Sequence, residues 1–452
     1  MLPTKVLIAN RGAIARRVIE ACDRLGIASV AVYSEADGGA PYLMEASQVL
    51  ALAGSRAEET YLNQPALLAA LAQSGADAVH PGYGFLAENA DFADAVVATG
   101  STFIGPAPRL LRTLGDKVAA RRLAAERGFP VFPGSELLDS VETALIAADE
   151  IGFPLMLKPA AGGGGIGMRV VADANALRNA FAPASEQALR SFGDGGIYLE
   201  KWLAEPRHIE FQILADQHGN AHHLYERECS IQRRHQKIIE ETPAPGIDAQ
   251  ALLELAGQAA ALAGDLGYDN VGTVETLRTA DAQYGFLEMN PRIQVEHAVT
   301  EVVTGVDLVA QQIRLAGGER LAEMPARQGF GLEVRIYAEH AVTQLPSTGR
   351  LAVFRPPRLH AVRVATGYQE GQWVSPYYDP LLAKVIGRGS TREQAIGRVL
   401  IALKGFAIQG VHSNIPLLLG ILQDEEFLAG QIDTGYLPRF LNRVSKGVID
   451  AA

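Results

Sequence analysis

The most chemically informative stretch of the chain is a strict alternation of five polar residues. These residues are Glu288, Asn290, Arg292, Gln294 and Glu296. Successive side chains of an extended strand point to opposite faces, so all five would share one face of an extended chain. An ordinary half-exposed strand would carry Lys, Thr or Ser on that face. Two carboxylates, two amides and a guanidinium are instead the side chains that bind Mg²⁺ together with a small oxyanion.

A proline interrupts this alternation. Pro291 cannot donate to a β-ladder, so we expect the strand to end near it and residues 292–296 to run as a loop beside a cleft. The interleaved residues Met289, Ile293 and Val295 are predicted to face the opposite way, into a core.

A predicted hairpin brings a further carboxylate, that of Glu275, beside the alternating segment. Residues 271–278 and 284–290 read as two antiparallel strands, which would place Glu275 and Glu288 on neighbouring strands. Two strand glutamates are, in isolation, more often surface residues. Together with Asn290, however, they form a set of hard oxygen ligands suited to Mg²⁺ or Mn²⁺ that bridges nucleotide phosphates.

A glycine loop lies between two further predicted strands, residues 155–158 and 168–171. The loop, 162–167, formally matches a dinucleotide-binding fingerprint, but a strand and not a helix follows it, so the required context is missing. One interpretation is a surface hairpin; the other is a flap whose backbone N–H groups close over phosphates. Lys158, directly before the loop, favours the second interpretation.

The polar run from Glu226 to Lys237 is ambiguous. Taken alone, such a run is typical of a solvated surface. Cys229 lies within it, but no particular arrangement of histidine and aspartate marks it as a nucleophile, and we interpret it as a packed residue.

Bulk properties exclude several classes of protein. A chain of 452 residues is expected to form two to four domains. Its net charge of -11 argues against nucleic acid as the main partner. Its two cysteines provide no disulfide framework, and no apolar run is long enough for a membrane span, so we expect a cytoplasmic protein without membrane association.

The first 115 residues alternate predicted strands and helices, which indicates an open parallel α/β domain. The first turn, residues 10–12, lacks the glycines of a dinucleotide site, and nicotinamide binding is disfavoured. The predicted strands are residues 5–9, 29–33, 78–80 and 102–104.

The last third reads as a mixed β domain closed by helices. Its predicted strands are residues 332–338, 351–354 and 382–386, and its predicted helices are residues 392–403 and 416–423.

Seven motifs together resemble one family, the biotin carboxylase subunit or domain of biotin-dependent carboxylases, an ATP-grasp enzyme. The resemblance covers essentially the whole chain. Carbamoyl-phosphate synthetases share the ATP-grasp chemistry but lack this combination. The motifs are Val6–Gly12, His80–Leu86, Gly115–Lys117, the glycine loop, Gln232–Lys237, the alternating segment and Tyr377–Pro380.

The resemblance implies a multidomain α/β and α+β fold. An N-terminal Rossmann-like domain would span residues 1–115, and an ATP-grasp domain would span 116–325 with a glycine-rich lid at about 131–203. A C-terminal biotin carboxylase domain would span 330–446.

The implied activity is the ATP- and bicarbonate-dependent carboxylation of biotin through carboxyphosphate. This is the first half-reaction of a multi-subunit carboxylase such as acetyl-CoA carboxylase, and it makes the chain an ATP-dependent C–N ligase. ATP would bind with Mg²⁺ or Mn²⁺. No Met-Lys-Met attachment motif is present, so biotin is expected on a separate carrier protein, with separate carboxyltransferase subunits. A homodimer is implied by resemblance only, and the sequence does not define the final carboxyl acceptor.

By similarity, one set of residues would bind ATP and its metal. Lys117, Lys158 and His208 would meet the phosphates, with Gly162, Gly163, Gly164 and Gly165 as the closing lid. Glu200, Lys201 and Leu203 would line the adenine pocket, and Gln232 and His235 the nucleotide more generally. Glu275, Glu288 and Asn290 match the metal-binding positions.

A second set would bind bicarbonate and biotin. Lys237, Arg292, Gln294 and Val295 match the bicarbonate pocket, and Glu296 matches the general base. Arg335 matches the residue that stabilises the biotin enolate, although on its own it reads as a surface strand arginine. Tyr83 and Phe85 would border the biotin ring.

The chain departs from the family pattern at four positions that we single out, Ala13, Ile166, Ala298 and Ala365. Ile166 removes a cation from the glycine loop. These departures leave open a degenerate ATP-binding or scaffolding subunit, and an ATP-grasp ligase for another acceptor is the third alternative. None of the departures removes a residue assigned to chemistry.

Overall fold

The computed structural model describes residues 1–161 and 165–450, with backbone only for 445–450. The N-terminal lobe is a parallel five-stranded sheet in the order β3-β2-β1-β4-β5. The predicted open α/β arrangement is therefore confirmed. The sequence missed β3, because its residues alternate between half-buried and exposed at the sheet edge and form no apolar run. Its strands are β1 Lys5–Ile8, β2 Ala28–Tyr33, β3 Gln48–Ala51, β4 Ala78–His80 and β5 Thr102–Phe103.

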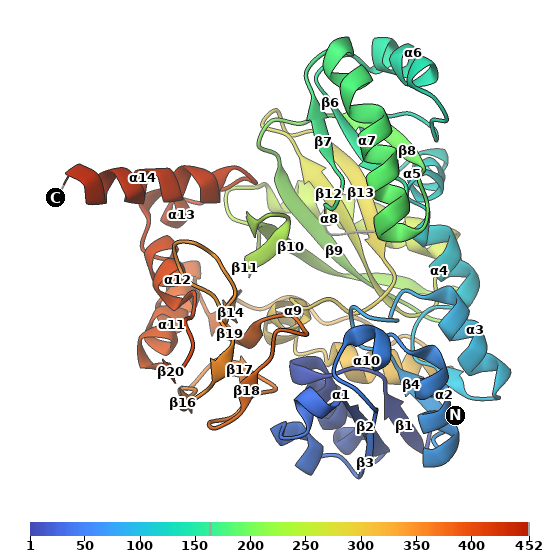
Figure 1. The fold of residues 1–452 in the computed structure, drawn as a ribbon, viewed down its shortest axis with the longest axis vertical. Helices are drawn as coiled ribbons and strands as arrows, with labels where there is room; N and C mark the ends of the chain where they lie inside the picture. Colours follow the sequence, from blue (N-terminus) through green and yellow to red (C-terminus); the bar gives the residue numbers. More distant parts are fainter. Residues whose placement is uncertain (162–164, 451–452) are drawn as a thin grey trace.

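Helices flank this sheet (Figure 1). The first, α1, ends at Gly26, whose left-handed φ of 70° is one that glycine adopts without steric cost. The helices of this part are α1 Gly12–Leu25, α2 Gln64–Ser74, α3 Ala90–Ala98, α4 Pro108–Gly115 and α5 Lys117–Glu126, with short 3₁₀ turns at Glu35–Asp37, Pro41–Met44 and Ala57–Glu59.

The lid has a small sheet and a core of its own. Its strands run in the order β7-β6-β8, and the predicted hairpin is confirmed by the antiparallel pairing of Leu155 with Val171. Alanines and leucines of two helices pack on this sheet as a separate hydrophobic cluster. Gly162, Gly163 and Gly164 of the predicted loop lie outside the described residues. The elements are α6 Val141–Ile151, β6 Leu155–Pro159, β7 Arg169–Val171, α7 Ala174–Phe192 and β8 Ile197–Lys201.

One antiparallel sheet of eight strands forms the centre of the molecule, in the order β13-β12-β9-β10-β11-β14-β19-β17. β11 pairs with β14, with Ile239 opposite Val334, so the sheet continues across the boundary that the sequence predicted near residue 330. The strands are β9 Arg207–Ala215, β10 Ala221–Arg233, β11 Gln236–Thr242, β12 Val271–Arg278, β13 Tyr284–Asn290, β14 Phe330–Tyr337, β17 Val362–Ala365 and β19 Leu381–Gly389.

The predicted strand at residues 351–354 is wrong as a single element. β15 (Gly349–Arg350) pairs with β18 (Trp373–Val374), and β16 (Val353–Arg355) pairs with β20 (Ala407–Gln409). The chain changes partner between them, because Leu351 N–H donates to Gln372 and Ala352 N–H donates to Gln409.

The remaining helices cover the central sheet and close the C-terminal part. The two helices predicted there are confirmed with shifted ends, whereas α13 and α14 were not predicted. No helix in the described part of the chain is long and apolar enough to cross a membrane. The helices are α8 Ala249–Asp265, α9 His297–Thr304, α10 Leu308–Ala316, α11 Arg392–Gly405, α12 Ile415–Ile421, α13 Glu425–Leu428 and α14 Tyr436–Asp450.

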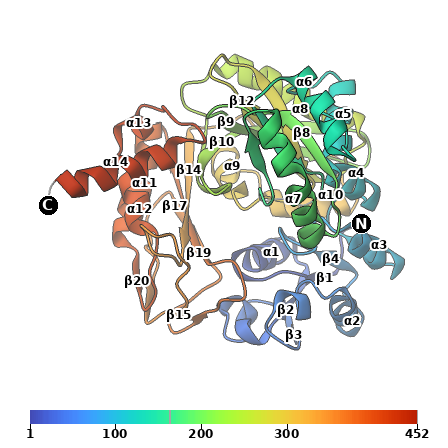
Figure 2. The ribbon, with the colours of Figure 1, turned by 45° about the horizontal axis from the view of Figure 1, so that its top comes forward.

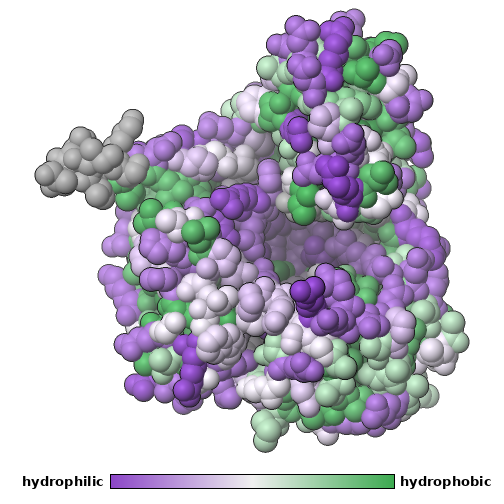
Figure 3. Space-filling view, viewed as in Figure 1, coloured by the Kyte–Doolittle hydropathy of each residue, from purple (hydrophilic) through white to green (hydrophobic). Residues whose placement is uncertain are grey.

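The lid and the N-terminal lobe lie on opposite sides of the molecular centre (Figures 1 and 2). The space-filling view shows a hollow between them with a largely hydrophilic wall (Figure 3). The central sheet thus holds polar residues at a cleft between two lobes.

We expect the core behind this sheet to be sensitive to truncation. Phe211 of β9 is fully buried in one cluster with Leu252 and Val274. Phe211→Ala should lower the free energy of unfolding by about 3–5 kcal/mol, because it removes apolar contacts and leaves a cavity. The measurement is the apparent melting temperature. Ile401→Ala, at a side chain that is 60% exposed on α11, is the control. An unchanged melting temperature for Phe211→Ala would contradict the packing described here.

Candidate active site

A cavity of about 620 Å³ opens at the face of the central sheet below the lid. Of the predicted site residues in the described parts of the chain, all but Tyr83 and Phe85 line it. They are Lys117, Lys158, Gly165, Glu200, Lys201, Leu203, His208, Gln232, His235, Lys237, Glu275, Glu288, Asn290, Arg292, Gln294, Val295, Glu296 and Arg335.

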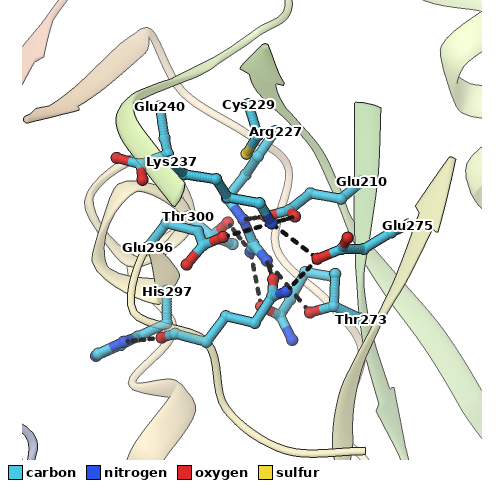
Figure 4. Close-up of polar contacts among 12 residues, drawn as sticks. Glu210, Arg227, Cys229, Lys237, Glu240, Thr273, Glu275, Glu296, His297 and Thr300 are labelled. Carbon is cyan, nitrogen blue, oxygen red and sulfur yellow. Dashed lines mark hydrogen bonds and ion pairs between the residues drawn. The ribbon is translucent and has the colours of Figure 1, made fainter. Parts of the chain in front are cut away.

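Lys237 lines this cavity, and its ammonium points toward Glu210, Glu275 and Glu296 (Figure 4). Its Nζ is 2.8 Å from Glu275 Oε1 and 2.8 Å from Glu296 Oε1, and it also donates to Glu210 Oε2. Burial alone would lower the pKa of Lys237, but the charges of these three carboxylates raise it well above its ordinary value. One buried cation therefore joins three buried anions.

Glu296 is held ionised by its neighbours. It is the N-cap residue of α9, yet its side chain does not cap the helix and instead meets Lys237 and Arg335, whose Nη2 is 3.0 Å from Glu296 Oε2. Burial would raise its pKa, but the charges of Lys237, Arg335 and Arg227 hold that pKa well below the ordinary range. A carboxylate that stays ionised at neutral pH can accept a proton from a bound substrate.

Glu275 connects Lys237 to two further residues of the cavity wall, Gln294 and His208. Gln294 Nε2 donates to Glu275 Oε1 at 2.6 Å, and His208 Nε2 is 3.0 Å from Glu275 Oε2. Gln232 Nε2 in turn lies 2.8 Å from His208 Nδ1. Burial opposes ionisation of Glu275, but Lys237 and His208 hold its pKa well below the ordinary value.

The predicted metal ligands lie together at one side of the cavity. Glu275 and Glu288 are direct cross-strand partners, which confirms the predicted hairpin, and Asn290 Nδ2 is 3.4 Å from Glu288 Oε1. Their hard oxygen atoms fit Mg²⁺ or Mn²⁺. Within the described residues, His208 and Glu210 also place ligand atoms within 4.8 Å of those of Glu275.

Arg292 joins the cavity to the N-terminal lobe. Its Nε donates to Glu88 Oε1 at 2.6 Å, and its Nη2 donates to Asn290 Oδ1 at 2.9 Å. The strand ends at Asn290, as Pro291 predicted. The expectation that Val295 faces a core is wrong, because the chain has left the strand and its side chain lines the cavity.

The two lysines predicted for the ATP phosphates are paired with carboxylates. Lys158 Nζ is 2.5 Å from Glu200 Oε2, and Lys117 Nζ is 3.6 Å from Glu288 Oε2. Lys201 Nζ donates to the backbone oxygen of Gly152 at 2.8 Å. These cations therefore have protein partners that a nucleotide's phosphates would displace or share.

Only part of the run from Glu226 to Lys237 is a solvated surface: residues 226–231 are buried, whereas Arg234 and His235 are exposed. Glu226, Arg227 and Glu228 are at most 1% exposed, because β10 lies inside the sheet with α8 and α9 packed against it. Cys229 is buried too, and burial next to Glu210 raises the pKa of its thiol well above the ordinary value. A thiol in that state is a poor nucleophile, in agreement with its interpretation as a packed residue.

Tyr83 and Phe85 do not line the cavity. Phe85 instead packs against two tyrosines, with ring centroids 5.1 Å from Tyr61 and 6.2 Å from Tyr378. Any contact of these two residues with biotin therefore stays a prediction.

Sequence reasoning missed Glu88, Glu210, Arg227 and Glu240. The signal for Glu210 was present, because His208, Glu210 and Gln212 alternate along β9 on the face opposite the apolar residues. Glu88 carried no comparable signal, since it reaches the site from another lobe.

Three family models match the chain in sequence order. They are the biotin carboxylase N-terminal domain over residues 3–111, the carbamoyl-phosphate synthase L chain ATP-binding domain over 116–324, and the biotin carboxylase C-terminal domain over 333–439. Together with the lid, the central sheet and the cavity, these matches define an ATP-grasp protein.

Similar proteins identify the family within the ATP-grasp class. Biotin carboxylase 2 of Bacillus subtilis is 45% identical over 442 residues, which is 97% of this chain and 100% of the relative. Biotin carboxylase of Allochromatium vinosum is 46% identical over 97% of this chain and 98% of its own. The chain belongs to the biotin carboxylase family.

Solved structures agree with this assignment. The dimeric biotin carboxylase domain of Hydrogenobacter thermophilus 2-oxoglutarate carboxylase, in complex with MgADP, ADP and bicarbonate, has a TM-score of 0.95 at 40% identity, covering 98% of this chain and 99% of that one. Biotin carboxylase from Campylobacter jejuni in a β,γ-ATP complex also has a TM-score of 0.95 at 40% identity, covering 97% and 99%.

Glu240 is a buried carboxyl directly behind the cavity. Its Oε1 lies 2.6 Å from Arg335 Nη2, but the two groups are not aligned for a hydrogen bond. Burial raises the pKa of Glu240 from 4.5 to about 8, with Arg335 opposing and Glu333 adding to the shift. The folded protein therefore retains a proton here that the unfolded chain has lost at neutral pH.

This shift predicts a pH dependence of stability. Because the folded-state pKa is raised, the stabilisation is complete below pH 4.5 and is lost as the pH rises through about 8. Wild type should lose up to about 1.4 kcal/mol per pH unit within this window relative to Glu240→Gln, whose amide carries no charge. Melting temperatures of both proteins from pH 6 to pH 9 provide the measurement, with exposed Glu58→Gln as the control. Parallel profiles would show that the proton is not retained.

Proposed function

We propose that this chain carboxylates biotin on a separate carrier protein, using ATP and bicarbonate. The observation that carries the proposal is the bridge at Lys237, whose ammonium lies 2.8 Å from both Glu275 on the nucleotide side and Glu296 on the bicarbonate side. Such a bridge holds a phosphoryl donor and its acceptor in one cavity, and phosphoryl transfer depends chiefly on that positioning.

In the first step, Glu296 takes the proton of bicarbonate, and Arg292 and Lys237 hold the resulting anion. A carbonate oxygen attacks the γ-phosphorus of ATP, the bond from that phosphorus to ADP breaks, and carboxyphosphate forms. Glu275, Glu288 and Asn290 would hold Mg²⁺ or Mn²⁺, which neutralises phosphate charge when bound. Lys117, Lys158 and His208 are proposed to bind the phosphates.

In the second step, carboxyphosphate releases CO₂ and phosphate, and N1′ of biotin bonds to the CO₂ carbon. The proton of N1′ passes to the released phosphate, the strongest base then present. Arg335 is held by its hydrogen bond to Glu296 and cannot lose its own proton, so its guanidinium can stabilise the enolate oxygen of the biotin ring.

The proposal includes partner proteins and the boundaries of three domains. A biotin carboxyl carrier protein and carboxyltransferase subunits would complete the reaction, and a homodimer is supported by the dimeric Hydrogenobacter relative. The division into 1–115, 116–325 and 330–446 is supported by the three family-model ranges, 3–111, 116–324 and 333–439.

A degenerate ATP-binding subunit is the second candidate, favoured by Ile166, which is 51% exposed beside Gly165 where the family carries a cation. The intact bridge at Lys237 argues against it. ADP release with free biotin separates the candidates: stimulation by bicarbonate and biotin together supports the carboxylase. No stimulation, from protein that binds ATP normally, supports the degenerate subunit, and stimulation by bicarbonate alone supports a ligase for another acceptor.

Glu296→Gln tests the general base. It should reduce bicarbonate-dependent ADP release by at least about 100-fold, because an amide cannot accept the proton. ATP binding, measured by calorimetry, should be retained. Glu241→Gln is the matched control, since Glu241 is 3% exposed and paired with Arg392 outside the cavity. Turnover near that of wild type would refute the role of Glu296.

Ile166→Arg tests the departure in the lid. Restoring a cation beside Gly165 should lower the apparent KM for ATP by up to about fivefold, since an exposed charge contributes up to ~1 kcal/mol. Val170→Arg, at a side chain of the same lid that is 52% exposed, is the control for added charge. If both variants show the kinetics of wild type, the departure is neutral.

A further inference from the structure

The side chain of Arg227 is fully buried in the middle of the central sheet (Figure 4). Its five N–H donors meet five acceptors on four separate segments. These contacts are Nε to Glu210 at 2.5 Å, Nη1 to Gln212 at 2.7 Å and to Thr300 at 3.0 Å, and Nη2 to Gln294 at 2.7 Å and to Thr273 at 3.2 Å.

Burying a charged guanidinium raises the free energy of the folded state unless each of its N–H donors has a hydrogen-bond acceptor. Arg227 meets that condition with a single carboxylate, Glu210, and four neutral oxygens. Arg17, a buried arginine elsewhere, has two carboxylate partners but leaves its Nε and Nη1 without hydrogen bonds. The acceptors around Arg227 therefore fix one orientation of its guanidinium group.

The contact with Arg227 also sets the orientation of the Gln294 amide, which lines the cavity. Arg227 Nη2 donates to Gln294 Oε1, so the oxygen of that amide faces the arginine. The amide nitrogen consequently faces Glu275, to which it donates at 2.6 Å, and the cavity that Gln294 lines. In this orientation the amide presents a donor, and not an acceptor, to an anion.

Glu210 links the same arginine to the Lys237 bridge. Its Oε1 accepts from Arg227 and its Oε2 accepts from Lys237, so the carboxylate is shared by two cations. Arg227 thereby offsets part of the negative charge around Lys237, and its charge also contributes to the low pKa of Glu296.

We propose that Arg227 is a positioning residue of the bicarbonate pocket, which acts by holding the Gln294 amide with its nitrogen toward the anion. The inference rests on the proposed function. Arg227 does not line the cavity. Its effect should therefore appear in the affinity for bicarbonate and not in that for ATP.

Arg227→Lys is the first test, because lysine keeps the charge but not the planar fork. With MgATP, bicarbonate and free biotin, we expect the KM for bicarbonate to rise about tenfold or more, as for a lost charge-assisted hydrogen bond. The KM for ATP should stay near the wild-type value. Arg392→Met is the matched control, since Arg392 is also a largely buried arginine bound to a carboxylate, Glu241, and lies outside the cavity.

Gln212→Met is the second variant, for the case in which Arg227→Lys does not fold. It removes one anchor of Arg227 without changing a residue that lines the cavity. A smaller rise in the KM for bicarbonate, with that for ATP unchanged, supports the proposal.

A double variant tests whether the effect passes through Gln294. If it does, Arg227→Lys combined with Gln294→Met should be no worse in bicarbonate KM than Gln294→Met alone. Three results would overturn the positioning role. In the double variant, the increases in bicarbonate KM of the two single variants would multiply. In Arg227→Lys, the KM values for bicarbonate and ATP would rise together, or the KM for bicarbonate would not change. Wild type is measured first: if its ADP release does not depend on bicarbonate, the proposed function fails, and not the inference about Arg227.

Discussion

Three buried carboxylates share the ammonium of Lys237, and the active site depends on this charge balance. Glu210, Glu275 and Glu296 would repel one another in a low-dielectric interior, and without the cation at least one would take up a proton. The charge of Lys237 helps to hold the pKa values of Glu275 and Glu296 well below the ordinary value. These ion pairs also fix the positions of the carboxylates, because each carboxylate contacts Lys237 and Lys237 in turn contacts the other two.

The central sheet makes this arrangement possible. Strand alternation places His208, Glu210 and Gln212 on one face of β9, where His208 lines the cavity, while Ile209 and Phe211 pack into the core on the other face. β12, which pairs with β9, supplies Glu275, and β11, separated from β9 by β10, supplies Lys237. A site made from several adjacent strands of one sheet is positioned more precisely than one made from loops, because the ladder of backbone hydrogen bonds sets the spacing.

Much of this could be read from the sequence, for identifiable reasons. The hairpin of residues 271–278 and 284–290 was predicted with its observed ends, because alternation is a local signal and Pro291 marks its limit. The burial of Glu226 to Ser230 could not be predicted, since a polar run looks the same on a surface and inside a charge-balanced sheet. The pairing of Arg292 with Glu88, 204 positions apart, leaves no trace in local pattern. Nor does the partner exchange at Leu351, which tertiary contacts decide.

The continuity of the eight-stranded sheet has a mechanical consequence. β11 and β14 are hydrogen-bonded to each other, so Lys237 on β11 and Arg335 on β14 belong to one stiff sheet. The lid, by contrast, has its own three strands and its own hydrophobic cluster. Stiffness is therefore unevenly distributed: the lid can move as a separate body while the β11–β14 pairing keeps the spacing between Lys237 and Arg335.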